Sequence, residues 1–116
     1  METLFSEMQG ALVVMPSGRL DTNTAPEAEK MLVDRIKGGM NCVVIDFTKT
    51  DYISSAGLRV ILKAAKLLKN SSGKIALCNA NAQIFEVLEL SGFLTLLTHS
   101  DNLEAALVIV AKQDAS

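Results

Sequence analysis

Two hydrophobic patterns alternate along this chain, one typical of strands and the other of helices. Short runs rich in apolar residues, of strand length, occupy residues 4–8, 11–15, 43–45, 74–78 and 93–98. Between them, apolar residues recur every three or four positions, as on one face of a helix. The predicted order is β-β-α-β-α-β-α-β-α, which implies right-handed crossovers and a largely parallel sheet.

The first two runs predict a hairpin, because Gln9-Gly10 separates them and glycine readily takes the positive φ of a tight turn. A turn-rich segment, 17–24, then leads into a helix predicted over 25–37. Thr24 and Glu27 have the spacing of a capping box at its start. The expected buried stripe of this helix is Ala28, Met31, Leu32 and Ile36.

The stretch 43–68 joins a buried strand to a helix through a serine-bearing turn. Asp46 ends the apolar strand, and Ser54 and Ser55 precede the helix. The expected inward face of this helix is Leu58, Ile61, Leu62, Ala65 and Leu68, with Arg59, Lys63 and Lys66 opposite. Because the first amides of a helix lack partners within it, the serines lie where a phosphate is stabilised.

The last third of the chain predicts two more helices and a weak strand over 93–98. Asn79 or Asn81 caps the first helix, whose inward residues are Ile84, Val87 and Leu88. Asp101 and Glu104 indicate the start of the second, with the stripe Leu103, Ala106, Leu107 and Val110. Loops after parallel strands meet at one edge of a sheet, so the turns 17–24, 48–55 and 79–81 are expected to lie together.

Composition limits the function. The 116 residues give room for a single domain, 1–116, and a net charge of −2 argues against direct nucleic-acid binding. The N-terminus lacks the pattern of a secretory signal and the longest apolar run is too short for a membrane span, so we expect a cytoplasmic protein. Cys42 and Cys78 lack metal-ligand spacing and are expected to be buried free thiols.

Three stretches, in this order, resemble a known family. They are Gly18-Arg-Leu-Asp21 followed by Thr24, then VVIDF and YISSAGLRVIL in 43–62, and finally Leu90-Ser-Gly-Phe93. The chain resembles a STAS domain, the fold of bacterial anti-sigma-factor antagonists, over nearly its whole length. The resemblance implies an α/β fold with a central mixed, mostly parallel β-sheet, about four helices and an N-terminal β-hairpin.

The family's phosphorylation loop reads aspartate, acceptor serine, serine or threonine, glycine, leucine. Aligned on Gly57-Leu58, this pattern places the acceptor on Ser55, with Ser54 where the family has aspartate. Ser54 therefore stays open as a competing acceptor. The resemblance also implies a partner-binding surface. Its residues are Asp21, Thr24, Ser54, Ser55, Gly57, Leu58 and Arg59.

The resemblance implies a partner-switching role. The unmodified protein would bind an anti-sigma factor that is itself a serine kinase and so free the sigma factor. Phosphorylation would release the partner, and a metal-dependent serine phosphatase would reset the switch. The chain would be a substrate, not an enzyme, with no cofactor and no metal, and a monomer or weak homodimer.

Each candidate residue also has a simpler interpretation. Ser55 would serve as a helix N-cap, Asp21 as a turn former and Gly57 as a site of close packing. Arg59 would be a solvated side chain, and the lone His99 a surface residue at a strand end. The apolar residues 108–110 would belong to the core or to a weak self-association surface.

Two other protein classes match the sequence less well than a STAS domain does, and a second function within the STAS family stays open. A phosphoaspartate receiver would use Asp46 but needs an acidic pair and a lysine that are not in place. A serine hydrolase needs a nucleophile elbow, and 54–57 lacks its first glycine. The remaining alternative is a STAS domain that is not phosphorylated and acts as a scaffold or a small-ligand or nucleotide-binding module.

Overall fold

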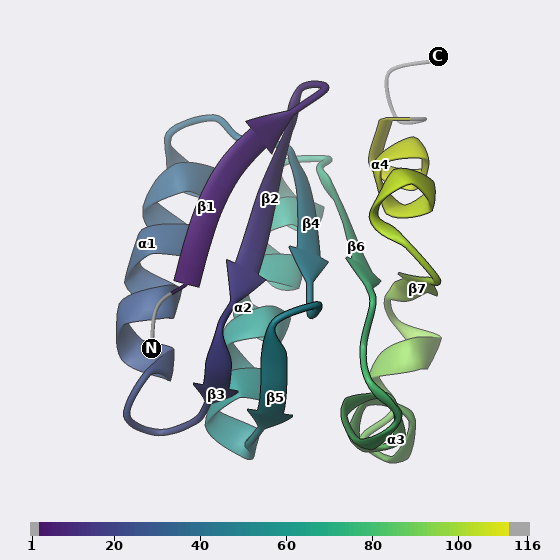
Figure 1. Ribbon diagram of the computed structural model, residues 1–116. Coiled ribbons are helices and arrows are strands. Elements are labelled where there is room, and N and C mark those ends of the chain that lie inside the picture. Colours follow the sequence, from purple (N-terminus) through teal and green to yellow (C-terminus); the bar gives the residue numbers. More distant parts are fainter. Residues whose placement is uncertain (1–2, 112–116) are drawn as a thin grey trace.

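A central sheet organises the computed structural model, which describes residues 3–111. Its five strands lie in the order β1-β2-β4-β6-β7, and β1 runs antiparallel to β2 whereas the other pairs are parallel (Figure 1). The strands are β1 (Thr3–Met8), β2 (Ala11–Pro16), β4 (Cys42–Asp46), β6 (Lys74–Cys78) and β7 (Thr98–Ser100). The predicted hairpin is confirmed: Gln9 and Gly10 have φ of 53° and 81°, as its tight turn requires.

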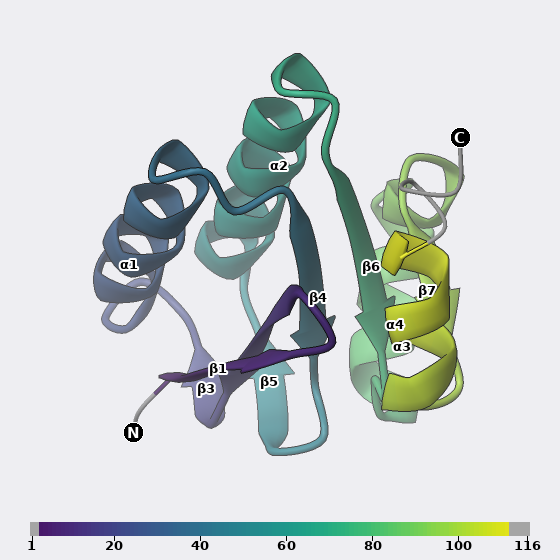
Figure 2. The same cartoon turned by 90° about the horizontal axis from the view of Figure 1, so that it is seen from above.

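Helices cover the two faces of this sheet unequally. They are α1 (Ala25–Lys37), α2 (Ser55–Asn70), α3 (Ala82–Leu90) and α4 (Leu103–Ala111), with a 3₁₀ turn η1 (Phe93–Thr95). Buried residues of α1, α2 and α3 pack in one core on one face, and α4 packs alone on the other (Figure 2). None of the helices within 3–111 has the length and apolar character needed to cross a membrane.

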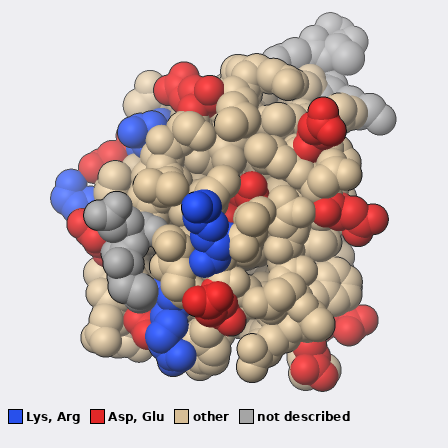
Figure 3. All heavy atoms as spheres, viewed as in Figure 1, with Lys and Arg blue, Asp and Glu red and all other residues tan. Residues whose placement is uncertain are grey.

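The face under α4 stays partly open. Leu4 and Met8 of the edge strand β1 are 47% and 41% exposed, and Val108 of α4 is 53% exposed. Figure 3 views the molecule from this side and shows only scattered charged side chains on it. Of the predicted apolar segment 108–110, Val110 belongs to the core, whereas Val108 faces solvent.

Two predicted helix faces were partly wrong. In α1, Met31 is 38% exposed, whereas Ala25, Ala28, Leu32 and Ile36 are buried. In α2 the buried residues are Gly57, Val60, Ile61, Ala64 and Leu68, so the buried stripe is rotated away from Leu58, Leu62 and Ala65. The small residues Gly57 and Ala64 let α2 approach the sheet closely. They were not predicted to be buried, because the prediction rested on large apolar side chains.

A second sheet was not predicted from the sequence. Residues predicted to be turns form β3 (Gly18–Leu20) and β5 (Thr50–Ile53), which pair in parallel with each other. Their short, mostly polar sequences carry almost no strand signal. This two-stranded sheet continues below the main one in Figure 1 and leads directly into α1 and α2.

Three predicted local details differ from the structure. Thr24 precedes α1 but its side chain makes no capping hydrogen bond, so the capping box with Glu27 does not form. The strand expected over 93–98 is instead η1 followed by β7, with Phe93 buried. The helix start indicated by Asp101 and Glu104 is confirmed, since α4 begins at Leu103. The capping side chain is that of Asn102, whose Oδ1 accepts a hydrogen bond from the Ala105 amide at 2.8 Å, and not that of Asp101.

Cys78 is a fully buried free thiol, as predicted, whereas Cys42 is half-buried. Burial, and next the neighbouring Asp46 carboxylate, raise the pKa of the Cys78 thiol to about 12. Since only the thiolate is an effective nucleophile, Cys78 should resist alkylation by iodoacetamide at about pH 8 in the native protein and react after unfolding. Mass spectrometry of the alkylated peptides checks this, and rapid native labelling of Cys78 would contradict it.

Candidate functional site

Ser54 and Ser55 occupy different positions at the junction of β5 and α2. Ser54 is the half-buried N-cap of α2, with extended backbone, and its Oγ accepts a hydrogen bond from the Ala56 amide at 3.2 Å. Its own amide donates to the Leu20 carbonyl at 3.0 Å, which ties the junction to β3. Ser55 is the first residue of α2 and is exposed, and its hydroxyl has no hydrogen-bond partner within the described chain. The helix-cap interpretation therefore applies to Ser54 and not to Ser55.

The turn between β3 and α1 is held by Asp21 and Thr24. The Asp21 carboxylate accepts from the Asn23 amide at 3.0 Å and from Arg19 Nε at 3.2 Å. The Thr24 hydroxyl donates to the Arg19 carbonyl at 2.7 Å and accepts from the Asp21 amide at 3.0 Å. Thr24 thus uses its side chain to shape the turn instead of capping α1.

Asp21 keeps its negative charge readily. Desolvation alone would raise its pKa, but hydrogen bonds from the Asn23 and Thr24 amides and from Arg19 outweigh this, so the pKa of Asp21 lies below its ordinary value. The Arg19 guanidinium also stacks on the Tyr52 ring at 4.2 Å from its centroid. Arg19 and Tyr52 are register partners in the small sheet. A fixed anion and a fixed cation therefore lie beside the serine junction.

Gly57, Leu58 and Arg59 follow the serines in the first turns of α2. Gly57 is buried, and a Cβ there would lie 2.7 Å from the Leu20 carbonyl oxygen. Leu58 is half-buried against the core, and Arg59 is exposed. Arg59 comes four residues after Ser55, so both project from the same side of the helix.

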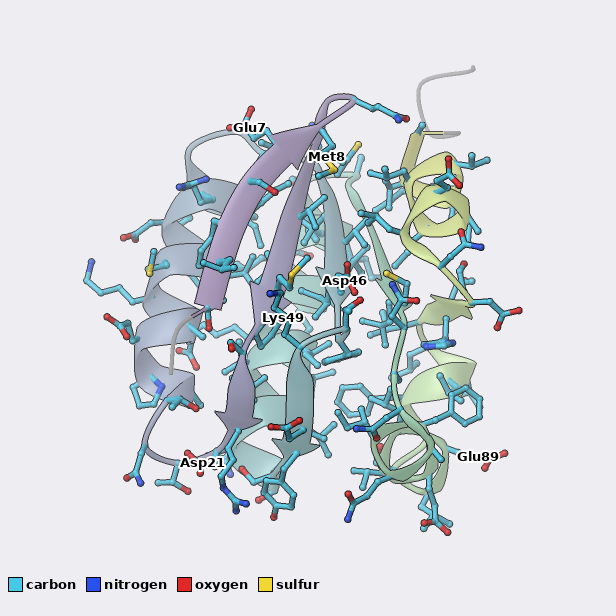
Figure 4. All side chains as sticks on the ribbon, in the orientation of Figure 1. Glu7, Met8, Asp21, Asp46, Lys49 and Glu89 are labelled. Carbon is cyan, nitrogen blue, oxygen red and sulfur yellow. The ribbon has the colours of Figure 1, made fainter. Side chains whose placement is uncertain are left out.

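The third of the predicted turns, 79–81, is tied to this junction. Asp46 is only 2% exposed, and its Oδ1 accepts from the Thr48 amide at 2.9 Å and from Asn79 Nδ2 at 3.1 Å. Asn81 caps α3 and donates from Nδ2 to the Thr50 carbonyl at 3.4 Å. Figure 4 shows Asp46 at the end of β4 in the centre of the sheet and Asp21 farther down, below β3. The predicted meeting of the three turns at one edge is confirmed.

Comparison with known proteins identifies the family. The family model for the STAS domain matches residues 5–106. The chain belongs to the STAS domain family. A putative anti-sigma factor antagonist, BtrV, of Bordetella bronchiseptica is 36% identical over 106 residues, 91% of each chain.

Two further comparisons agree with the family assignment. The anti-sigma F factor antagonist of Paenibacillus polymyxa is 31% identical over 96 residues, 81% of each chain. The crystal structure of a putative anti-sigma factor antagonist from Thermotoga maritima superposes with a TM-score of 0.89 at 23% identity, covering 94% of each chain. The STAS fold predicted from the sequence is confirmed.

In this STAS domain, His99 differs from its prediction as a surface residue. It is half-buried in β7, its Nε2 accepts a hydrogen bond from the Ala80 amide at 3.2 Å, and its ring meets Phe85 edge-on at 5.1 Å. Desolvation lowers the pKa of His99, against a smaller opposing effect of Asp101. His99 therefore fixes the turn before α3 in its neutral form. No group of three metal-ligating side chains occurs among residues 3–111.

Ser55 differs from a serine activated by a neighbouring base. A catalytic serine needs a base within hydrogen-bond distance, and the Ser55 hydroxyl has no such partner among the described residues. The hydroxyl is exposed at a helix N-terminus, where an added anion is stabilised.

Proposed function

We propose that this STAS domain is an anti-sigma factor antagonist switched by phosphorylation of Ser55. The observation that carries the proposal is the contrast between the two serines: the Ser54 hydroxyl is engaged with the Ala56 amide, whereas the Ser55 hydroxyl is exposed and unengaged. A kinase that transfers a phosphoryl group needs an accessible hydroxyl. Ser55 meets this need without any change in the fold, and Ser54 does not.

The surroundings of Ser55 favour the phosphorylated form electrostatically. The first turn of α2 contains no acidic residue, so its amides and partial positive charge are not already offset by a carboxylate there. A phosphoserine at the first helical position adds about −1.5 to −2 charges where the helix dipole stabilises them. Arg59, four residues on, supplies a nearby guanidinium. The fold should therefore keep its structure after modification.

The names of the relatives support an anti-sigma factor as the partner. The proteins similar to this chain are named anti-sigma factor antagonists, and we extend that role to this chain. Its partner is then an anti-sigma factor with serine kinase activity, which the unmodified form binds in the cytoplasm and the phosphorylated form releases. A metal-dependent serine phosphatase regenerates the binding form. The proposed contact surface consists of Ser55 with Asp21, Thr24, Ser54, Gly57, Leu58 and Arg59.

The proposal is tested by the site of phosphate addition. Incubation with the cognate kinase and ATP should add one phosphate to the wild-type chain and to Ser54→Ala, and none to Ser55→Ala. Intact-mass spectrometry and phosphopeptide mapping give the result. Ser54→Ala is the matched control, because it removes the neighbouring hydroxyl but leaves Ser55 in place.

Two outcomes would refute the assignment. Phosphate found on Ser54 with Ser55 untouched would move the acceptor to the cap residue. A chain that binds its partner but is never phosphorylated would support the alternative function, a STAS domain acting as an unswitched scaffold or ligand-binding module.

A further inference from the structure

A groove lies at the end of the molecule opposite the serine junction. It is bordered by the last turns of α2, the turn into β6, residues 96–98 and Ile109 of α4. Figure 2 looks onto this end, where α2 passes into β6. Because α2 begins at Ser55 and ends at Asn70, the serine junction and the groove lie at its two ends. The groove has a volume of about 620 Å³, within the range of about 300–1,000 Å³ typical of small-molecule sites.

The walls of the groove are apolar. Leu62, Leu68, Ile75, Leu97 and Ile109 line it. Leu96, also in the lining, is 68% exposed. The exposed Leu96 side chain and the apolar walls of the groove are in contact with water, and a ligand that covers them would bind favourably.

The rim of the groove carries a single sign of charge. Lys66, Lys69 and Lys74 line it, and none of its lining residues is acidic. Within residues 3–111 the ion pairs are Arg19–Asp21, Lys30–Asp34 and Lys63–Glu29, so none of them neutralises these lysines. Three lysines without an ion pair among the described residues thus gather at one groove, in a chain whose net charge is −2.

Helix capping explains only part of this cluster. A lysine in the last turn of a helix offsets the partial negative charge of its free carbonyls, which accounts for Lys69. Two of these carbonyls already accept hydrogen bonds: that of Leu68 from the Gly73 amide at 2.6 Å and that of Lys69 from the Ser72 amide at 3.3 Å. Lys66 lies before the last turn and Lys74 begins β6, so neither is needed for this purpose.

We propose that this groove binds a single-chain anionic amphiphile, such as a fatty acid carboxylate. Its hydrocarbon tail would lie against the leucine and isoleucine side chains, and its carboxylate would lie among the ammonium groups of Lys66, Lys69 and Lys74. The long lysine side chains can cover the tail with their methylene groups while their charged ends reach the head group. The charge complementarity of rim and head group is what selects an anionic ligand over a neutral one. This site is independent of Ser55 and adds a ligand to the proposed switch.

The test titrates the ¹⁵N-labelled protein with dodecanoate below its micelle concentration and follows amide chemical shifts. Dodecyl maltoside is the neutral probe with the same tail, and acetate is the head group without the tail. Dodecanoate should shift the amides of 62–75 and 96–98 at saturable concentrations, whereas the neutral probe and acetate should bind at least about tenfold more weakly.

Variants separate the groove from nonspecific binding. Lys66→Gln combined with Lys69→Gln should weaken dodecanoate binding by about tenfold, since two charge contacts are lost. Lys37→Gln, a change at an exposed lysine at the end of α1, is the matched control and should leave affinity unchanged. Equal affinity for dodecanoate and dodecyl maltoside, shifts that lie outside the groove, or identical effects of the two lysine variants would each overturn the proposal.

Discussion

Replacing Ser55 with aspartate is expected to weaken binding to the proposed partner, an anti-sigma factor kinase, by roughly a hundredfold, a change of about 2.7 kcal/mol. Ser55 is exposed beside the Asp21 turn, and a kinase that reaches its hydroxyl must cover both. A carboxylate at 55 would have to lose water in that interface without a partner prepared for it. Desolvating one unpaired charge readily costs this much free energy.

Asp21 increases the effect on binding. Its pKa lies below the ordinary value because of hydrogen bonds from its own turn and Arg19, so it stays ionised at neutral pH. A second negative charge at 55 would place like charges within one contact surface, and like charges disfavour association. The switch therefore needs no change in the folded structure, only a change in the surface presented to the partner.

Titration calorimetry of the wild type, Ser55→Asp and Ser55→Ala against the kinase measures this directly. Ser55→Ala should bind as tightly as the wild type, because the small side chain adds neither bulk nor charge. Circular dichroism of all three establishes that they are equally folded. Equal affinities for the three proteins would show that position 55 lies outside the interface or that the switch works by another route.

The sequence predicted the large elements of the fold well, because their signals are strong. The hairpin at Gln9-Gly10, the helices α1 and α2 and the strands β4 and β6 were all predicted at their observed places. The small sheet was missed, because β3 and β5 are short and have only one or two buried residues each. Leu20 and Ile53 turn inward, whereas Arg19 and Asp51 are exposed.

The site was predicted in position but not in detail. The serine junction and the Asp21 turn could be located from the helix start and the family pattern. The sequence could not show which serine caps α2, because the two side chains are identical and only the folded backbone brings the Ala56 amide to Ser54 Oγ. The role of Asp46 was also missed: its partners Thr48 and Asn79 come from two different loops, and only the folded chain brings them together.

Replacing Gly57 with alanine is expected to lower the free energy of unfolding by about 2 kcal/mol, although alanine is the better helix former. A Cβ at 57 would lie 2.7 Å from the Leu20 carbonyl oxygen, 2.8 Å from Ile53 Cγ1 and 2.9 Å from Leu20 Cγ. The carbonyl cannot retreat freely, because it accepts the hydrogen bond from the Ser54 amide at 3.0 Å. The helix preference of alanine over glycine is worth about 1 kcal/mol, so the clash with fixed backbone outweighs it.

Urea unfolding of the wild type, Gly57→Ala and Gly38→Ala measures the free energy of unfolding of each protein. Gly38 is the matched control: its φ is −79°, and a Cβ there would come no nearer than 3.3 Å to the Asp34 carbonyl oxygen. Gly38→Ala should change stability by less than about 0.5 kcal/mol. If α2 moves away from β3 to admit the new methyl group, the Ser54–Leu20 hydrogen bond must lengthen, and phosphorylation of Ser55 should slow in the same variant. A Gly57→Ala protein as stable as the wild type would mean that the close contact of α2 with β3 is not required, and that the serine junction is held by the Ser54 cap alone.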